Sequence, residues 1–180
     1  MSKWSKRLQA WDEAASHRLR LTDRRGLLRS LAAFLAHSGD SWFWGIGLLL
    51  LIAKGTSFWR SWALTQLSGI FLLAVLVMIL KFAFRRRRPE GDWGGIYRAT
   101  DPHSFPSGHA ARAIFLAIVT IFLGPPWLAI LLLLWAPLVA LARVAMGVHY
   151  LSDVLGGLLF GLLLALGWIN GLGIQSGIMP

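Results

Sequence analysis

The chain has 180 residues, of which 56% are hydrophobic, with a mean hydropathy of +0.60 and a formal net charge of +10. This apolar content exceeds that of soluble globular proteins and predicts a polytopic membrane protein. There is no cysteine, which excludes disulfide and thiolate chemistry. The basic residues lie beside apolar segments, so anionic membrane lipids and phosphorylated lipids are the expected partners, and nucleic acid is not.

Residues 1–40 are predicted to form interfacial helices ahead of a membrane core at residues 41–180. Apolar residues recur at helical spacing between charged ones, at Trp4, Leu8, Trp11, Ala15 and Leu19. This pattern is typical of an amphipathic helix in the membrane interface. The apolar stretch at 26–37 covers only about 18 Å as a helix, too short for about 30 Å of hydrocarbon. We expect it to form a second interfacial or partly inserted helix.

Five apolar segments are predicted to cross the membrane, at residues 42–53, 62–80, 106–123, 127–142 and 154–169. Several are shorter than the roughly 20 residues of a full crossing and should extend into flanking residues. The predicted fold is therefore an all-α bundle of about five membrane helices, or six if residues 26–37 also cross. Tryptophans near the proposed ends suit interfacial belts, at Trp42, Trp44, Trp59, Trp62, Trp127 and Trp168.

The polar residues of this core gather at one set of segment ends. Consecutive segments alternate in direction, so the end of the second and fourth segments and the start of the third and fifth share one membrane face. The residues at these ends are Lys81, Arg88, Ser107, Gly108, His109, Arg143, His149 and Asp153. Within the last segment, Gly157 and Gly161 are expected to serve close helix packing.

An anion site is expected on this face. Pro106 suits the first turn of a helix, and the backbone N–H groups of Ser107 and Gly108 would then point outward toward an anion. Gly108 also allows a ligand to approach the backbone closely. The cations that would surround the anion are Lys81, Arg88 and Arg143.

Two histidines complete a site for phosphoryl transfer. His149 and Asp153 are four residues apart, so on a helix they share a face and the carboxylate can orient the imidazole. We expect His149 to be the nucleophile and His109 the acid that protonates the leaving oxygen. No metal or other cofactor is expected, because the histidines are isolated and acidic residues are few.

Three short motifs carry this site. Residues 81–89 read KFAFRRRRP, residues 106–109 read PSGH, and residues 142–153 read ARVAMGVHYLSD. In order and spacing they resemble the three motifs of the type 2 phosphatidic acid phosphatases. One position departs from the family, which usually has Ser where this chain has Ala142. That change would remove one hydrogen bond to phosphate or to a neighbouring side chain.

The resemblance implies a helical membrane phosphatase that cleaves lipid phosphate monoesters or diphosphates through a phosphohistidine, without metal. Phosphatidic acid, phosphatidylglycerophosphate and a polyprenyl phosphate or diphosphate all fit a cationic pocket beside a bilayer. By the same match, His149, His109 and Asp153 are the catalytic residues. The phosphate would be held by Lys81, Arg88, Ser107, Gly108 and Arg143.

Single residues also have simpler interpretations. Arg85, Arg86 and Arg87 are expected to be a solvated run that binds head groups. Asp153 could cap the last helix. Contact with substrate is one interpretation of His103 and Ser104, and packing in the loop is the favoured one. Arg112 is expected to reach the site or to pair with Asp101 or Glu90.

Two other functions fit part of the pattern. Vanadate-dependent haloperoxidases share this arrangement of residues but are soluble and much longer. A catalytically silent protein that binds or moves lipid phosphates would keep the cations, yet such proteins usually lose the nucleophile or its partner. Here His109, His149 and Asp153 are all present, which favours an enzyme.

The membrane is expected to be the bacterial cytoplasmic membrane, and the orientation has two interpretations. With five crossings, the N-terminus and nearly all basic residues lie on the site face, and the positive-inside rule then places the site in the cytoplasm. The family resemblance more often implies an extracytoplasmic site. A sixth crossing at residues 26–37 would ease this conflict.

Overall fold

The computed structural model describes residues 3–22, 26–90 and 101–173, with side chains from Arg7 onward. Seven helices occupy these ranges, which confirms the predicted all-α class. They are α1 (Lys3–Arg18), α2 (Leu27–Ser38), α3 (Ser41–Lys54), α4 (Ser57–Phe84), α6 (Gly108–Leu123), α7 (Pro126–Ala145) and α8 (Leu151–Gly171).

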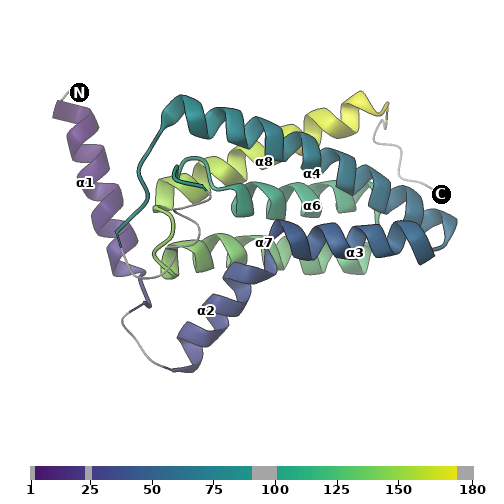
Figure 1. The fold of residues 1–180 in the computed structure, drawn as a ribbon, viewed down its shortest axis with the longest axis horizontal. Helices are drawn as coiled ribbons and strands as arrows, with labels where there is room; N and C mark the ends of the chain where they lie inside the picture. Colours follow the sequence, from purple (N-terminus) through teal and green to yellow (C-terminus); the bar gives the residue numbers. More distant parts are fainter. Residues whose placement is uncertain (1–2, 23–25, 91–100, 174–180) are drawn as a thin grey trace.

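The last five of these helices run alongside one another as a bundle (Figure 1). Among the described residues, α4, α7 and α8 are long and apolar enough to cross a membrane, and α3 and α6 are shorter apolar helices. These five helices correspond to the five predicted segments, and four of them extend beyond their segment at both ends, as expected. The exception is α6, which begins at Gly108 because Ser107 is its N-cap, so Pro106 precedes the helix.

The core lies around α6, between α4, α7 and α8. Phe115 and Leu116 of α6 are fully buried with Leu73 of α4. At Gly157 and Gly161 of α8, an added Cβ would collide with the backbone oxygens of Ser107, the N-cap of α6, and of Ala111 in its first turn, which confirms that these glycines permit close packing. Large apolar side chains on the outside of the bundle remain exposed, as in a protein surrounded by lipid.

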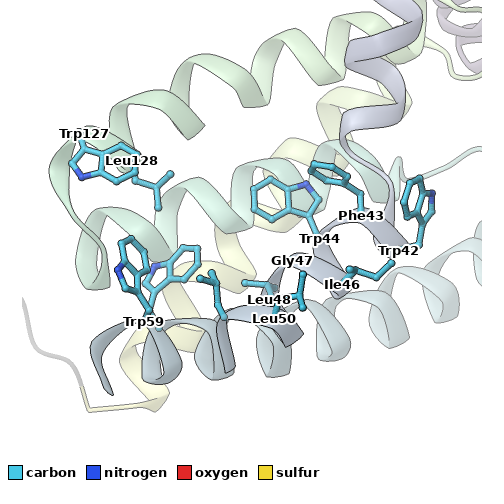
Figure 2. Close-up of a pocket in the computed structure, with 12 residues that line it drawn as sticks. Trp42, Phe43, Trp44, Ile46, Gly47, Leu48, Leu50, Trp59, Trp127 and Leu128 are labelled. Atoms are coloured by element: carbon cyan, nitrogen blue, oxygen red, sulfur yellow. The ribbon is translucent and has the colours of Figure 1, made fainter. Parts of the chain in front are cut away.

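An apolar groove of about 510 Å³ lies between α3 and the starts of α4 and α7, and all of its lining residues are Trp, Phe, Ile, Leu or Gly. Figure 2 shows Trp42 and Trp44 at one end of the groove and Trp59 and Trp127 at the other. Trp42 is 65% and Trp127 61% exposed, as expected for interfacial belts. Trp62 is only 5% exposed, so its assignment to a belt is wrong. Its ring packs into the core beneath the turn between α6 and α7.

Helix α2 lies at the end of the bundle that carries the predicted site (Figure 1). Ala32 and Ala36 pack against Ala142 and Met146 at the end of α7. The opposite side of α2, which includes Phe34, is exposed. Helix α2 therefore contacts the bundle at the end that carries the predicted site.

Helix α1 lies across the same end of the bundle (Figure 1). Trp11 and Leu8 on its apolar face are each 66% exposed. The buried face is polar instead, with Asp12 at 5% and Ser16 at 1% exposure. The structure thus attaches α1 to the bundle by hydrogen bonds and leaves its apolar side exposed; the side chain of Trp4 lies outside the described residues.

Candidate active site

The helix ends on one side of the bundle enclose a cavity of about 140 Å³. An engineered cavity of about 150 Å³ holds benzene, so this space suits one phosphate group and excludes a whole lipid. One wall is apolar and is formed by α4. The other walls carry six of the eight predicted site residues, namely Lys81, Arg88, Gly108, His109, Arg143 and His149. The remaining two, Ser107 and Asp153, are fully buried.

His149 lies in the turn between α7 and α8 and is 1% exposed. The two residues His149 and Asp153 do not share a helix, because α8 begins at Leu151. The pair still forms, with 3.5 Å between His149 Nδ1 and Asp153 Oδ2. This distance is longer than an ideal hydrogen bond.

The hydrogen bonds of His149 define its tautomer. Arg88 Nη1 lies 3.2 Å from His149 Nε2 and also donates to Val148 O at 2.9 Å. A guanidinium can only donate, so Nε2 must accept and the ring proton belongs on Nδ1, which faces Asp153. Burial, with Arg88 and Arg143 nearby, lowers the pKa of His149 to about 3. The imidazole is therefore neutral near pH 7, with a lone pair on Nε2.

Asp153 has two roles that the sequence treated as alternatives. Its Oδ2 accepts the Tyr150 N–H at 2.8 Å and completes a capping box at the start of α8. Its Oδ1 accepts from Arg86 Nη1 at 2.7 Å. Capping and the contact with His149 thus use the same buried carboxylate, which is held rigidly from both sides.

Arg86 was predicted to be solvated, and this prediction is wrong. Its guanidinium bridges Asp153 to Asp12 of α1, with Nη2 donating to Asp12 Oδ2 at 2.6 Å. It also stacks 4.2 Å above the Tyr150 ring. Its neighbours Arg85 and Arg87 are exposed, as expected. Residue spacing alone does not distinguish these three arginines. In the structure, Arg86 is the one of the three that turns toward a buried carboxylate.

Lys81 and Arg88 share a carboxylate, Asp101, that sequence reasoning did not assign to the site. Lys81 Nζ bonds Asp101 Oδ2, and Arg88 Nη2 donates to the same oxygen at 2.8 Å. Lys81 also donates to the backbone oxygen of His103 at 3.2 Å. Asp101 holds the two cations together at the cavity wall and offsets part of their mutual repulsion.

The start of α6 differs in one respect from the predicted anion site. The Ser107 N–H donates to Asp153 O at 2.9 Å and does not face an anion, whereas its side chain accepts from Ala110 N and caps the helix. At Gly108, an added Cβ would meet no atom closer than 3.6 Å, so packing does not require a glycine there. This leaves open space at the helix start for a ligand.

Arg143 is fully buried at the cavity, and its Nη1 lies 3.5 Å from Ala36 O of α2. The neighbouring Ala142 belongs to the apolar cluster with α2 and is not among the residues that line the cavity. The Ser-to-Ala departure therefore faces α2, away from the phosphate space.

His109 has a carboxylate partner that the sequence analysis missed. Its Nε2 lies 2.7 Å from Oδ1 of Asp40, in the turn between α2 and α3. Burial would raise the pKa of Asp40, but hydrogen bonds with His109 and His37 hold that pKa well below its ordinary value. The alternation argument could have found Asp40, because the start of the first predicted segment lies on the same membrane face as the end of the second.

The remaining loop residues have structural roles. Ser104 bonds the backbone of Arg86, and His103 forms a bridge with Arg87, which confirms the predicted loop packing. Arg112 lines the cavity, and its hydrogen bonds go to Gly39 and Ser41 instead of Asp101 or Glu90. In the described ranges, no group of three or more His, Asp or Glu residues could hold a metal ion.

Comparison with known proteins identifies the family to which this fold and cavity belong. A sequence profile of the PAP2 superfamily matches residues 62–173. The chain is 33% identical to an undecaprenyl-diphosphatase of Sulfolobus acidocaldarius, over 82% of this chain and 70% of the relative. It is also 33% identical to phosphatidylglycerophosphatase B of Bacillus subtilis, over 87% of this chain and 81% of the relative.

A solved structure agrees with these relatives. The crystal structure of a transmembrane PAP2 type phosphatidylglycerolphosphate phosphatase from Bacillus subtilis superposes with a TM-score of 0.76 at 29% identity. The match covers 96% of this chain and 89% of that one. The chain belongs to the PAP2 superfamily, and it is an integral-membrane lipid phosphatase of that type.

Proposed function

We propose that this phosphatase works through a phosphohistidine formed on Nε2 of His149. The support is the hydrogen bond from Arg88, which leaves Nε2 as an acceptor, and the carboxylate of Asp153 at Nδ1. Nε2 attacks phosphorus, and the electron pair of the breaking P–O bond goes to the leaving oxygen. Asp153 stabilises the positive charge that develops on the ring.

His109 is proposed to supply the proton that the leaving oxygen takes up. It lines the same cavity as His149, which places both rings around one small space. In the second step, a water attacks the phosphohistidine, His109 accepts its proton, and phosphate leaves from a restored neutral His149.

The phosphate is proposed to lie among Lys81, Arg88 and Arg143, beside Gly108 at the start of α6, where the buried Ser107 caps the helix. The three cations offset its negative charge, and their charge is what a metal ion would otherwise supply. We therefore propose a metal-independent reaction without a cofactor.

The substrate is proposed to be a lipid phosphate monoester or diphosphate. The apolar wall of the cavity includes Ala74 and Met78 of α4, which are exposed on the outer surface of the bundle. A hydrocarbon chain attached to the phosphate could leave the cavity along this wall and enter the bilayer. Phosphatidic acid, phosphatidylglycerophosphate and polyprenyl phosphates or diphosphates all meet this description.

Five crossings are proposed, by α3, α4, α6, α7 and α8, with α1 and α2 as the interfacial part at residues 1–40. Helix α2 has only 12 residues, about 18 Å, and contacts the end of α7. A bundle of apolar helices suits the bacterial cytoplasmic membrane, since outer-membrane spanning proteins are barrels.

Replacing His149 with Ala tests the mechanism. We expect release of phosphate from a detergent-solubilised lipid phosphate to fall by about a thousandfold or more, because removing a covalent catalyst costs several orders of magnitude. The wild-type protein is also allowed to react with a substrate whose phosphate is radiolabelled, and the reaction is then quenched. The protein should carry a covalent label that is stable to base and lost in acid. The variant should carry no label.

The matched control is His103→Gln, which changes a loop histidine and should keep most of the activity. Excess EDTA should leave wild-type turnover unchanged. Turnover of His149→Ala above about a tenth of wild type, or loss of activity in EDTA with recovery on adding Mg²⁺, would contradict the proposal.

A further inference from the structure

Both site histidines contact a carboxylate, but the two carboxylates come from different parts of the chain. His149 pairs with Asp153 in the first turn of α8, only four residues away, whereas His109 pairs with Asp40, which is 69 residues away. The PAP2 profile begins at residue 62, so Asp40 lies outside the matched region. The contact at 2.7 Å is the shorter of the two.

The turn that carries Asp40 is held in place by α6 itself. Arg112 lies one turn after His109 on α6, and its Nε donates to Gly39 O at 3.0 Å. Its Nη1 donates to Ser41 Oγ at 2.7 Å. The guanidinium thus anchors the residues on both sides of Asp40, and one helix carries both the histidine and the arginine that fixes its partner.

Packing supports the same arrangement. Gly39 is buried, and an added Cβ would lie 3.2 Å from His109 Cδ2 and 3.0 Å from Val139 Cγ1. The backbone of the turn therefore lies directly against the imidazole. Asp40 itself is only 9% exposed, so its carboxylate meets the ring in a site largely closed to water.

We propose that Asp40 is the positioning residue for His109, so that the phosphatase uses a second histidine–carboxylate pair for its proton transfers. This rests on the proposed function, in which His109 protonates the leaving oxygen. The carboxylate accepts Nε2–H and fixes the ring, and the transferred proton is carried on Nδ1. When Nδ1 releases that proton, the electron pair of the P–O bond has moved to the leaving oxygen and the ring is neutral.

Electrostatics explain why such a partner is needed. His109 shares the cavity with Arg112 and Arg143, and neighbouring cations disfavour a protonated imidazole. A carboxylate in contact with the ring favours that protonated form. Asp40 therefore counters the cations that phosphate binding requires, at the one histidine that must carry an extra proton.

The test is Asp40→Asn, which keeps the shape of the side chain but removes its charge. Activity is compared on a lipid phosphate monoester, whose alkoxide leaves poorly, and on p-nitrophenyl phosphate, whose phenolate needs little proton donation. We expect a loss of about tenfold to a hundredfold on the lipid and less than about threefold on the aryl ester, since general acid catalysis contributes about a hundredfold or more.

The matched control is His37→Gln. His37 contacts the other carboxylate oxygen of Asp40, Oδ2, at 3.1 Å, and its side chain is 49% exposed. This variant leaves the contact between Oδ1 and His109 in place. It should retain about half or more of the activity on both substrates, and thermal unfolding in detergent shows that each variant is folded.

His109→Ala and the double variant separate this inference from the proposed function. His109→Ala should show the same preference for the aryl ester, and adding Asp40→Asn to it should cost little more, because the two residues act as a unit. If His109→Ala loses both activities equally, the acid assignment itself fails. If His109→Ala shows the preference but Asp40→Asn loses both activities equally, or loses neither, then Asp40 does not position His109.

Discussion

At the scale of single residues, the site depends on burying groups that would be charged in water. His149 is nearly inaccessible, and the pKa of its ring falls from 6.5 to about 3 because burial disfavours the cation. This keeps Nε2 unprotonated, as the role proposed for His149 requires. It also links the stability of the fold to pH, because the unfolded chain binds a proton that the folded protein excludes.

The sign of this linkage leads to a prediction for His149→Gln. Between pH 6.5 and about 3 the unfolded state carries the extra proton, so the stability that His149 contributes at neutral pH is lost as pH falls through this range. From about pH 7 to about pH 5, wild type should lose about 2 kcal/mol more than the variant, at about 1.4 kcal/mol per pKa unit. Thermal unfolding in detergent at both pH values measures it.

The control is His17→Gln, which changes an exposed histidine of α1. This variant should follow the wild-type pH dependence. An equal acid-induced loss in His149→Gln and wild type would show that His149 is not the group that titrates.

At the scale of helices, α1 is attached to the site through polar contacts. Asp12 accepts the Ser152 N–H at 3.0 Å, and Ser16 Oγ accepts the Leu151 N–H at 2.8 Å. These are N–H groups in the first turn of α8, which lack partners within the helix. Arg86 joins Asp12 to Asp153, so the interfacial helix and the partner of His149 belong to one network.

Removing Arg86 should therefore affect catalysis from outside the cavity. We expect Arg86→Gln to lower kcat by about tenfold or more, because a misplacement of about 1 Å in a catalytic group can cost about a hundredfold. The same variant should increase hydrogen exchange at the start of α8, where α1 docks. Steady-state kinetics and exchange measurements on the purified protein test both effects.

Arg85→Gln and Arg87→Gln are the matched controls, because these neighbours are exposed. Both should retain near wild-type kcat and exchange. Similar losses in all three variants would indicate a general effect of basic charge and would contradict a specific role for Arg86.

At the scale of the whole molecule, the cavity combines a cationic end with an apolar wall on α4. Leu73 and Val77 are buried in this wall, whereas Ala74 and Met78 are exposed on the outside of the bundle. A lipid phosphate could thus keep its head in the cavity and its chain in the bilayer. The groove along α3 contains no charged lining residue and is a separate feature (Figure 2).

A large side chain in this wall should distinguish lipids from small esters. We expect Ala74→Trp to reduce kcat/KM for a lipid phosphate by about tenfold or more, the loss that corresponds to about 1.4 kcal/mol, because the ring would occupy the path of the chain. Turnover of p-nitrophenyl phosphate should change much less. Kinetics on both substrates in one detergent measure the difference.

Val75→Trp provides the control, since Val75 is 43% exposed on the same helix and does not line the cavity. It should leave both activities close to wild type. Equal loss of lipid and aryl ester turnover in Ala74→Trp would contradict an exit for the lipid chain along α4.

Much of the fold was predictable because its causes are local and periodic. Long apolar segments indicate helices, and alternating direction brings the ends of α4 and α7 to the starts of α6 and α8. The positions of Lys81, Arg88, His109 and His149 around one cavity follow from that alternation. The prediction that the Ser107 N–H faces an anion failed, because this N–H donates a hydrogen bond to Asp153 O of another helix.

The sequence by itself determined the class of fold, the end of the bundle that carries the site, and the three motifs, because each depends on spacing along one segment. Only the tertiary structure decided which carboxylate meets which cation or histidine. Asp40 with His109, Asp101 with Lys81, and Asp12 with Arg86 each join segments far apart in the chain. No periodicity marks such partners, because burial and direction of approach select them only once the helices have packed.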